Sequence, residues 1–181
     1  MAEADHPTGP VDERALDESV TFTSELIRID TTNRGDGTCR ERPAAEYVAE
    51  RLADTGLEPA LLERTPGRTN VVARIRGTDP SADALLVHGH LDVVPAMAAD
   101  WSVHPFSGEV RDGVVWGRGA IDMKNMDAMV LAVVRAWARG GGGPPPPPPR
   151  PKPPPAPGGP PPPPRGAAPP PPPPLHTGRR G

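Results

Sequence analysis

The chain has 181 residues, of which 23 are acidic and 20 are basic. All of the acidic residues precede residue 144. That part carries a net charge of −8, because it holds only 15 basic residues. Such an excess of acid argues against a nucleic acid partner, since phosphate binding needs clustered Lys and Arg. The sequence has no apolar run long enough for a membrane span and no secretory signal, and its single cysteine, Cys39, forms no disulfide within the chain. We therefore expect a cytoplasmic protein with no membrane contact.

Proline divides the chain into unequal parts. Residues 144–174 contain 22 of the 30 prolines. Proline lacks the backbone N–H and fixes φ, so neither a regular helix nor a central strand can form there. The sequence predicts a flexible N-terminus over residues 1–11, a foldable part over 12–140, and a disordered Pro/Gly-rich tail over 141–181.

Two amphipathic helices are expected first. One runs from Asp12, as its N-cap, to about Ile29. The second begins at Pro43 and ends near Gly56, which suits a left-handed C-terminal cap. Helical spacing predicts the buried side chains of both helices: Leu16, Val20, Thr23, Leu26 and Ile27 in the first, and Ala44, Ala45, Val48 and Leu52 in the second.

Several strands and a last helix follow. Residues 57–64 and 70–76 are predicted strands joined by a turn at 65–67, and the wholly apolar run 84–88 is typical of a strand covered on both faces. Asp112-Gly113 between residues 109–111 and 114–116 predicts a hairpin with a type I′ turn. A helix is expected from about Asp122 to Arg139. Its predicted apolar face comprises Met126, Met129, Val130, Val133 and Val134. Helices mixed with strands in this order predict an α/β or α+β domain.

The residues that carry chemistry stand between these elements. His90 and Asp92 are two apart at the end of the apolar run, so in a strand they point the same way. Asp92 could fix the tautomer of His90 and turn its other ring nitrogen toward a metal. The alternative is a buried histidine satisfied by a local hydrogen bond, and His88 is a rival ligand on the same strand face. Asp122 is either a helix N-cap or a carboxylate that bridges two divalent ions.

The combined motifs are more specific than their parts. HGHLDVVP, then W-x-x-x-P-F, then DGVVWGRGAIDMKNMDA resemble the M20 family of metallopeptidases and deacylases, and the opening IRIDTTN is also similar to that family. The resemblance implies an α/β zinc-peptidase fold, a mixed sheet flanked by helices. It also implies a homodimer formed through a lid that is absent here. In the family pattern His90 binds a metal, Asp92 supports it and acts in catalysis, and Asp122 bridges two zinc ions, with Co²⁺ or Mn²⁺ as alternatives. The implied substrates are small amides, either N-acyl amino acids or dipeptide-like molecules.

The sequence departs from the family after this point. The family's next motif is a Glu-Glu pair that supplies a general base and a ligand, yet no Glu follows Glu109. We expect an inactive, truncated or frameshifted fragment of a hydrolase, with the change of frame near Ala138-Arg139. The alternative is a non-catalytic metal-binding domain with a Pro-rich protein-interaction tail, since PPPPPPRPKPPP resembles a ligand of proline-recognising domains.

Overall fold

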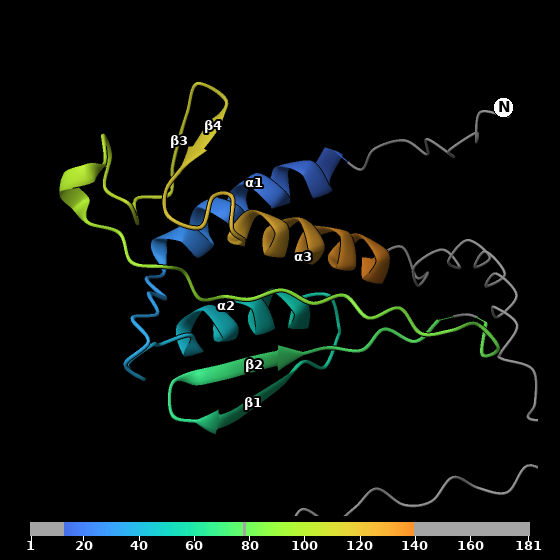
Figure 1. Cartoon of the computed structure of the whole chain (residues 1–181). Helices are drawn as coiled ribbons and strands as arrows, with labels where there is room; N and C mark the ends of the chain where they lie inside the picture. Colours follow the sequence, from blue (N-terminus) through green and yellow to red (C-terminus); the bar gives the residue numbers. More distant parts are fainter. Residues whose placement is uncertain (1–12, 78, 140–181) are drawn as a thin grey trace, which may run out of the picture. The chain divides into compact units, whose positions relative to one another are not determined.

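The computed structural model describes residues 13–77 and 79–139. In these ranges the elements are α1 (Glu13–Arg28), α2 (Arg42–Ala53), β1 (Ala60–Thr65), β2 (Arg68–Val72), the 3-10 turn η1 (Ala98–Asp100), β3 (Glu109–Arg111), β4 (Val114–Trp116) and α3 (Lys124–Arg139) (Figure 1). The predicted N-cap Asp12, the N-terminus predicted to be flexible (1–11) and the tail predicted to be disordered (141–181) lie outside the described residues. None of the helices in the described part is long and apolar enough to cross a membrane.

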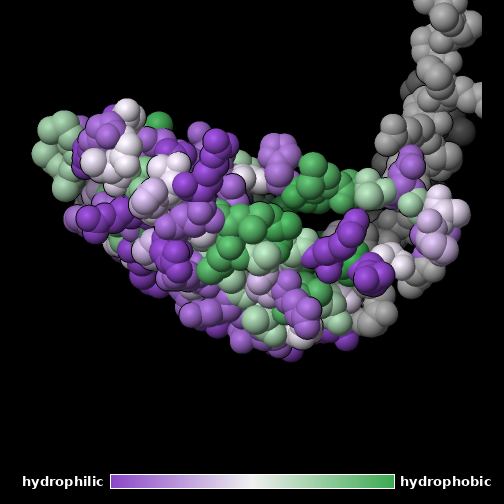
Figure 2. All heavy atoms as spheres, turned by 90° about the horizontal axis from the view of Figure 1, so that it is seen from below, coloured by the Kyte–Doolittle hydropathy of each residue, from purple (hydrophilic) through white to green (hydrophobic). Residues whose placement is uncertain are grey.

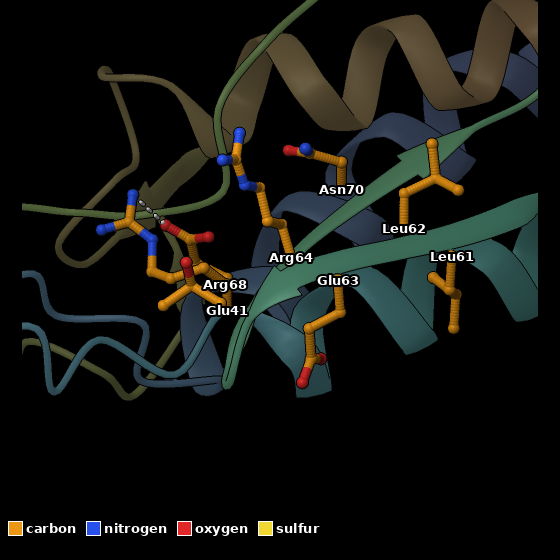
Figure 3. Close-up of a pocket in the computed structure, with 8 residues that line it drawn as sticks. Glu41, Leu61, Leu62, Glu63, Arg64, Arg68 and Asn70 are labelled. Carbon is orange, nitrogen blue, oxygen red and sulfur yellow. Dashed lines mark ion pairs between the residues drawn. The ribbon is translucent and has the colours of Figure 1, made fainter.

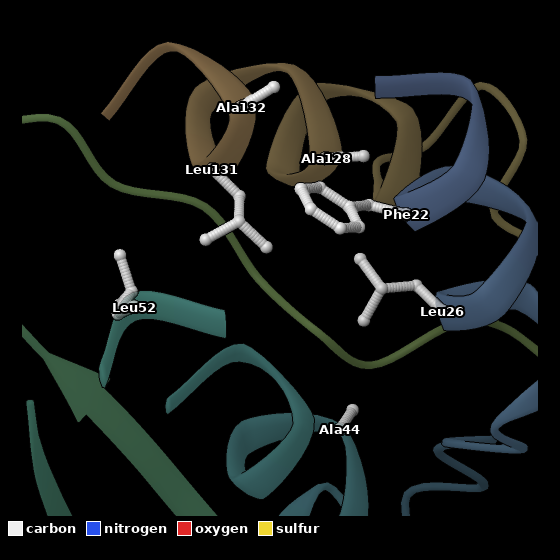
Figure 4. Packing of buried hydrophobic residues seen from close by; sticks show 7 residues of the cluster. All are labelled: Phe22, Leu26, Ala44, Leu52, Ala128, Leu131 and Ala132. Carbon is white, nitrogen blue, oxygen red and sulfur yellow. The ribbon is translucent and has the colours of Figure 1, made fainter. Parts of the chain in front are cut away.

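The core lies where α1 and α3 run side by side over α2 (Figures 1 and 4). Its buried cluster comprises Phe22, Leu26, Ala44, Leu52, Ala128, Leu131 and Ala132. Alanines on α3 let the two long helices approach closely, and Phe22 fills the space between them. The expected burial of Ala44, Ala45 and Leu52 on α2 is confirmed.

The buried faces of α1 and α3 differ from the predicted ones. On α1, Leu16 and Val20 are exposed, at 54% and 44%, while Phe22 and Ser24 are buried. On α3, Met126, Met129 and Val133 are exposed, and the buried face contains Lys124 and Arg135. The predicted burial of Thr23, Leu26 and Ile27 on α1 is confirmed, whereas that of Leu16 and Val20 is wrong. On α3 the prediction was wrong because it assigned charged side chains to solvent. Arg135 is instead buried through its ion pair with Glu18 of α1, at 3.3 Å.

Both hairpins were expected from the sequence. β1 and β2 pair antiparallel, with Leu61 opposite Val71, close to the predicted strands. β3 and β4 pair antiparallel around Asp112 and Gly113, whose φ values are 54° and 76°. Positive φ at both central residues is what a type I′ turn requires, and Asp and Gly tolerate it. The β3–β4 hairpin is joined to α1 by Ser24, whose Oγ donates to the Gly108 carbonyl at 2.5 Å.

The predicted strand 84–88 is not formed. These residues lie in no sheet, and Leu86 is 83% exposed. The described strands make two separate two-stranded sheets, so the expected single mixed sheet is also absent from this part of the chain. Apolar character predicts that a run is buried, but hydrogen bonding also needs a neighbouring backbone in register. A neighbouring backbone is reached only five residues farther on, where Val93 forms a parallel bridge with Thr32.

Candidate metal site

The segment that contains His90 and Asp92 is hydrogen-bonded to the loop that follows α1. Thr31 Oγ1 donates to the Leu91 carbonyl at 2.6 Å, and the Val93 N–H donates to the Thr31 carbonyl at 3.2 Å. The Asn33 N–H then donates to the Val93 carbonyl at 2.8 Å. These bonds fix residues 91–93 against the end of α1, so the backbone beside His90 does not depend on a sheet.

His90 lies between the two predicted acids. Its Nδ1 is 3.0 Å from the Asp92 carbonyl oxygen and 3.2 Å from Asp92 Oδ1. Its Nε2 is 3.2 Å from Asp122 Oδ1. The structure therefore brings His90, Asp92 and Asp122 together across 32 residues of sequence, with one acid on each ring nitrogen. The imidazole is half-exposed and so is open to a ligand from solvent.

The charge of this cluster favours a cation. Partial burial of the ring opposes protonation of His90. The hydrogen bond to the Asp92 carbonyl and the charges of Asp92 and Asp122 nevertheless raise the pKa of His90 above its usual value. In this geometry a proton on Nε2 occupies the place that a metal ion would take, because both are attracted by the Asp122 carboxylate.

A tight turn positions Asp122 ahead of α3. Gly119, with φ at 92°, adopts a conformation that other residues rarely take. The Gly119 carbonyl accepts the Lys124 N–H at 2.9 Å, which starts the helix. The carboxylate of Asp122 is turned toward His90 rather than toward the helix backbone, and it is 82% exposed.

The spacing of the two ligand atoms fits one tetrahedral ion. With bonds of about 2.0–2.2 Å to zinc and tetrahedral angles, two ligand atoms lie about 3.4 Å apart. His90 Nε2 and Asp122 Oδ1 are 3.2 Å apart. Within the described ranges no group of three or more His, Cys, Asp or Glu side chains is placed to hold an ion. His90 and Asp122 are thus spaced as two ligands of one ion would be.

Asn33 is a supporting residue that the sequence interpretation did not single out. Its Nδ2 donates to Asp92 Oδ2 at 2.7 Å, so it holds the carboxylate that faces His90. Asn33 closes the IDTTN segment, which had been noted only as part of the resemblance. No local pattern signals this role, because the bond joins residues 59 positions apart.

Asp127 was also missed, and it lies directly beneath the His90 stretch. Gly89 has no room for a side chain, because a Cβ there would overlap Asp127 Oδ1. Burial raises the pKa of Asp127 to about 6, although the charges of His90 and Lys124 oppose this. It lies in the first turn of α3, where the helix dipole favours a carboxylate.

Lys124 connects the end of α1, which leads to the loop that contacts Asp92, with the start of α3, which follows Asp122. Its side chain is fully buried, and Nζ donates to the Leu26 carbonyl at 2.8 Å and to the Ile29 carbonyl at 2.7 Å. These carbonyls lie at and just after the C-terminal end of α1, where the helix leaves carbonyl groups that need further donors. Burial lowers the pKa of Lys124 to about 8. One side chain thus fixes the end of α1 to the start of α3, two residues after Asp122.

Other candidates lie apart from this cluster. His88 is exposed and takes no part in the contacts of His90. Cys39 is buried rather than lying in an open polar loop, and burial raises the pKa of its thiol to about 11. A shallow hollow on the β1–β2 hairpin contains the Glu41–Arg68 ion pair at 3.0 Å (Figure 3). That hollow contains none of the motif residues.

Comparison with known proteins agrees with the fold and with the motifs. Residues 86–147 match the family model described as Peptidase family M20/M25/M40. The chain is 44% identical over 100 residues to a succinyl-diaminopimelate desuccinylase of Methylorubrum populi, covering 52% of this chain and 25% of that protein. It is 38% identical over 118 residues to aminoacylase-1 of Sus scrofa, covering 65% of this chain and 28% of that protein.

Two further similarities extend this result. An N-fatty-acyl-amino acid synthase/hydrolase of Mus musculus is 47% identical over 122 residues, covering 67% of this chain and 24% of that protein. The structure of human carnosine dipeptidase 1 superposes with a TM-score of 0.54 at 24% identity, covering 73% of this chain and 30% of that one, which shows a shared fold. The chain spans between about a quarter and a third of these relatives. The chain therefore carries the N-terminal part of an M20 family domain.

Proposed function

We propose that His90, Asp92 and Asp122 form the N-terminal half of the metal site of an amide hydrolase, with zinc as the preferred ion. The observation that supports this most directly is the 3.2 Å spacing of His90 Nε2 and Asp122 Oδ1, which suits two ligands of one ion. A bound divalent ion would supply polarisation of the amide carbonyl and a lowered pKa of water. Relatives named as desuccinylase, aminoacylase and acyl-amino acid hydrolase support the reaction class.

The chain's own residues prepare this half-site. Asp92 accepts a hydrogen bond from the Nδ1–H of His90, which leaves the lone pair of Nε2 directed toward Asp122. Asn33 holds the opposite oxygen of Asp92, so the carboxylate cannot rotate away. The exposed second oxygen of Asp122 is available to a second ion, as a bridging carboxylate would be.

The substrate class proposed is an amide close to a carboxylate, either an N-acyl amino acid or a dipeptide-like molecule. Two protein ligands hold zinc less tightly than the three or four of established hydrolytic and structural sites. A general base contributes roughly 10²–10⁴-fold to such reactions, and the sequence has no Glu after Glu109 to provide one. We therefore propose that this chain binds one ion weakly and does not turn over substrate by itself.

Metal titration against a chromophoric chelator tests the proposal. The unmodified chain should bind one Zn²⁺, His90→Ala should abolish binding, and Asp92→Asn should weaken it about 10–100-fold by releasing the imidazole. His88→Ala is the matched control and should bind like the unmodified chain. Retained binding in His90→Ala, or loss in His88→Ala, would remove His90 from the site and contradict the proposal.

A further inference from the structure

The chain contains two Asp-Gly sequences, Asp36-Gly37 and Asp112-Gly113, and no Asn-Gly sequence. In such a pair the backbone nitrogen of glycine lies next to the side-chain carboxyl of the aspartate, and the missing Cβ leaves that nitrogen free to approach it. Figure 2 shows apolar surface gathered around a hollow on one face of the molecule, and the residues of neither pair line that cavity. Both aspartates are instead exposed to water, so the two pairs can be compared as sites of the same reaction.

That reaction is the closure of a five-membered imide ring. The glycine nitrogen attacks Cγ of the aspartic acid, the nitrogen loses its proton and the carboxyl loses its OH group, so one water molecule leaves. Water then opens the imide. Attack at the former backbone carbonyl breaks its bond to nitrogen, and the main chain then runs through Cβ and Cγ as isoaspartate. No oxidant or cofactor is consumed, and the final mass equals that of the starting chain.

The two glycines are closely matched. Their φ values are +79° at Gly37 and +76° at Gly113, and a Cβ built at either position would meet nothing within 4 Å. Neither glycine is therefore crowded when its peptide rotates toward the preceding carboxyl. The difference between the two sites lies in the aspartates.

Hydrogen bonds from Thr38 hold the carboxylate of Asp36. Its Oδ1 accepts the Thr38 N–H at 2.9 Å and the Thr38 hydroxyl at 2.6 Å. The same bonds lower the pKa of Asp36, which keeps the group ionised, and a carboxylate is a poorer electrophile than a carboxylic acid. Ring closure needs the face of Cγ, so the group must first rotate and lose the bonds that hold its edge toward Thr38.

The carboxylate of Asp112 has no such restraint. Its side chain is 91% exposed, and it accepts no hydrogen bond from any residue that the structure describes. Arg111 Nε lies 3.8 Å from Asp112 Oδ2, which is too far for a hydrogen bond, and Arg111 is already paired with Glu109 at 3.0 Å. The tip of the β3–β4 hairpin projects away from the helices (Figure 1), so the carboxyl and the following peptide can both turn.

We propose that Asp112 is a site of spontaneous conversion to isoaspartate, whereas Asp36 in the same dipeptide is protected by its contacts with Thr38. The product presents the former backbone carboxyl as a side group, which is the group that isoaspartyl methyltransferases recognise. The extra main-chain atom falls in the type I′ turn, whose length sets the register of Arg111 opposite Val114. Conversion should therefore disturb the pairing of β3 with β4.

The base of the hairpin is held separately from its tip. The Arg118 N–H donates to the Pro105 carbonyl at 2.7 Å, and Ser24 of α1 donates to the Gly108 carbonyl. These bonds lie between the turn and Asp122, so the disturbance should stay within the hairpin. The proposal therefore does not rest on the hydrolase chemistry.

Storage of the full chain in mildly acidic buffer tests the proposal. Isoaspartate is measured at each site by peptide mapping with electron-transfer fragmentation, and in total by methyl transfer from an isoaspartyl methyltransferase. In the native chain we expect at least about tenfold more isoaspartate at Asp112 than at Asp36, because breaking a hydrogen bond to a charged group lowers the reactive population by about that factor. In urea, which removes the bonds of Thr38, the two sites should react at similar rates.

Thr38→Val is the matched variant, because it removes the hydroxyl donor and keeps the branched shape. It should raise isoaspartate at Asp36 in the native chain by about threefold or more and leave Asp112 unchanged. Equal amounts at the two sites in the native chain, or an excess at Asp112 that persists in urea, would overturn the proposal. A Thr38→Val chain that matches the unmodified chain at Asp36 would also overturn it. Metal and substrate are absent throughout, so these results stand apart from the proposed function.

Discussion

The buried Lys124 should make this protein more stable as the solution becomes mildly alkaline. Its folded-state pKa is about 8, below its ordinary value of 10.5, because burial disfavours the charged amine. Between these two values the unfolded chain binds more protons than the folded chain at this residue. Stability from Lys124 therefore rises with pH through this window.

The size of the effect follows from the width of the window. Each pKa unit corresponds to about 1.36 kcal/mol, so the full window of about 2.5 units is worth about 3 kcal/mol. Between pH 7.5 and pH 9 the increase in the free energy of unfolding should be about 1.2 kcal/mol. Above pH 9 the buried Cys39 opposes this gain in stability. Its pKa is raised from 9.0 to about 11, so the stability that the protonated thiol contributes is lost as pH rises through that range.

Urea denaturation at pH 7.5, 8.25 and 9 measures the slope. Lys124→Met is the matched variant, because it keeps an unbranched side chain of similar length and removes the titrating group. The difference between the two proteins cancels His90 and every other shared group. We expect the unmodified chain to gain about 1.2 kcal/mol over this range relative to Lys124→Met. Equal slopes in the two proteins would refute the assignment of a depressed pKa to Lys124.

Two further predictions rest on backbone space and on burial. Gly108→Ala should lower the free energy of unfolding by about 3 kcal/mol in thermal melts, because φ is +58° and a Cβ would meet the Ser24 carbonyl. Gly113→Ala, at φ +76° in open space, should lower it by only about 1–2 kcal/mol. Equal losses in the two variants would contradict the argument. Cys39 is 2% exposed and the pKa of its thiol is raised. At pH 8 it should therefore react with Ellman's reagent at least about tenfold more slowly in the native chain than in urea. Equal rates would show that the thiol is accessible.

Local patterns were sufficient for part of the fold. The hairpin at Asp112-Gly113 depends on the φ preferences of two residues, and the structure has it where expected. The helices depend on spacing over a few turns, and their limits were also predicted closely. Their buried faces were predicted only in part, because burial of Arg135 and Lys124 depends on partners in α1 that are about 100 residues away. The strand 84–88 failed for the same reason, since pairing depends on a second segment.

The candidate site shows the same division. His90, Asp92 and Asp122 could be chosen as candidate site residues because imidazole and carboxylate groups in a short motif indicate metal chemistry. Their supports could not be selected. Asn33 acts through one bond across 59 residues, and Asp127 acts by filling the space that Gly89 leaves.

The positions of the residues in the proposed half-site do not depend on either of the two-stranded sheets. Asp122 precedes α3, and Asp92 is held by the loop that follows α1. The separation of these two acids is therefore set by the contact between α1 and α3, which Lys124 fixes through two hydrogen bonds. Leu86 and Val72 line a cavity beside β2 and take no part in these two hydrogen bonds. Lys124→Met should therefore weaken zinc binding, whereas Leu86→Lys should leave zinc affinity unchanged.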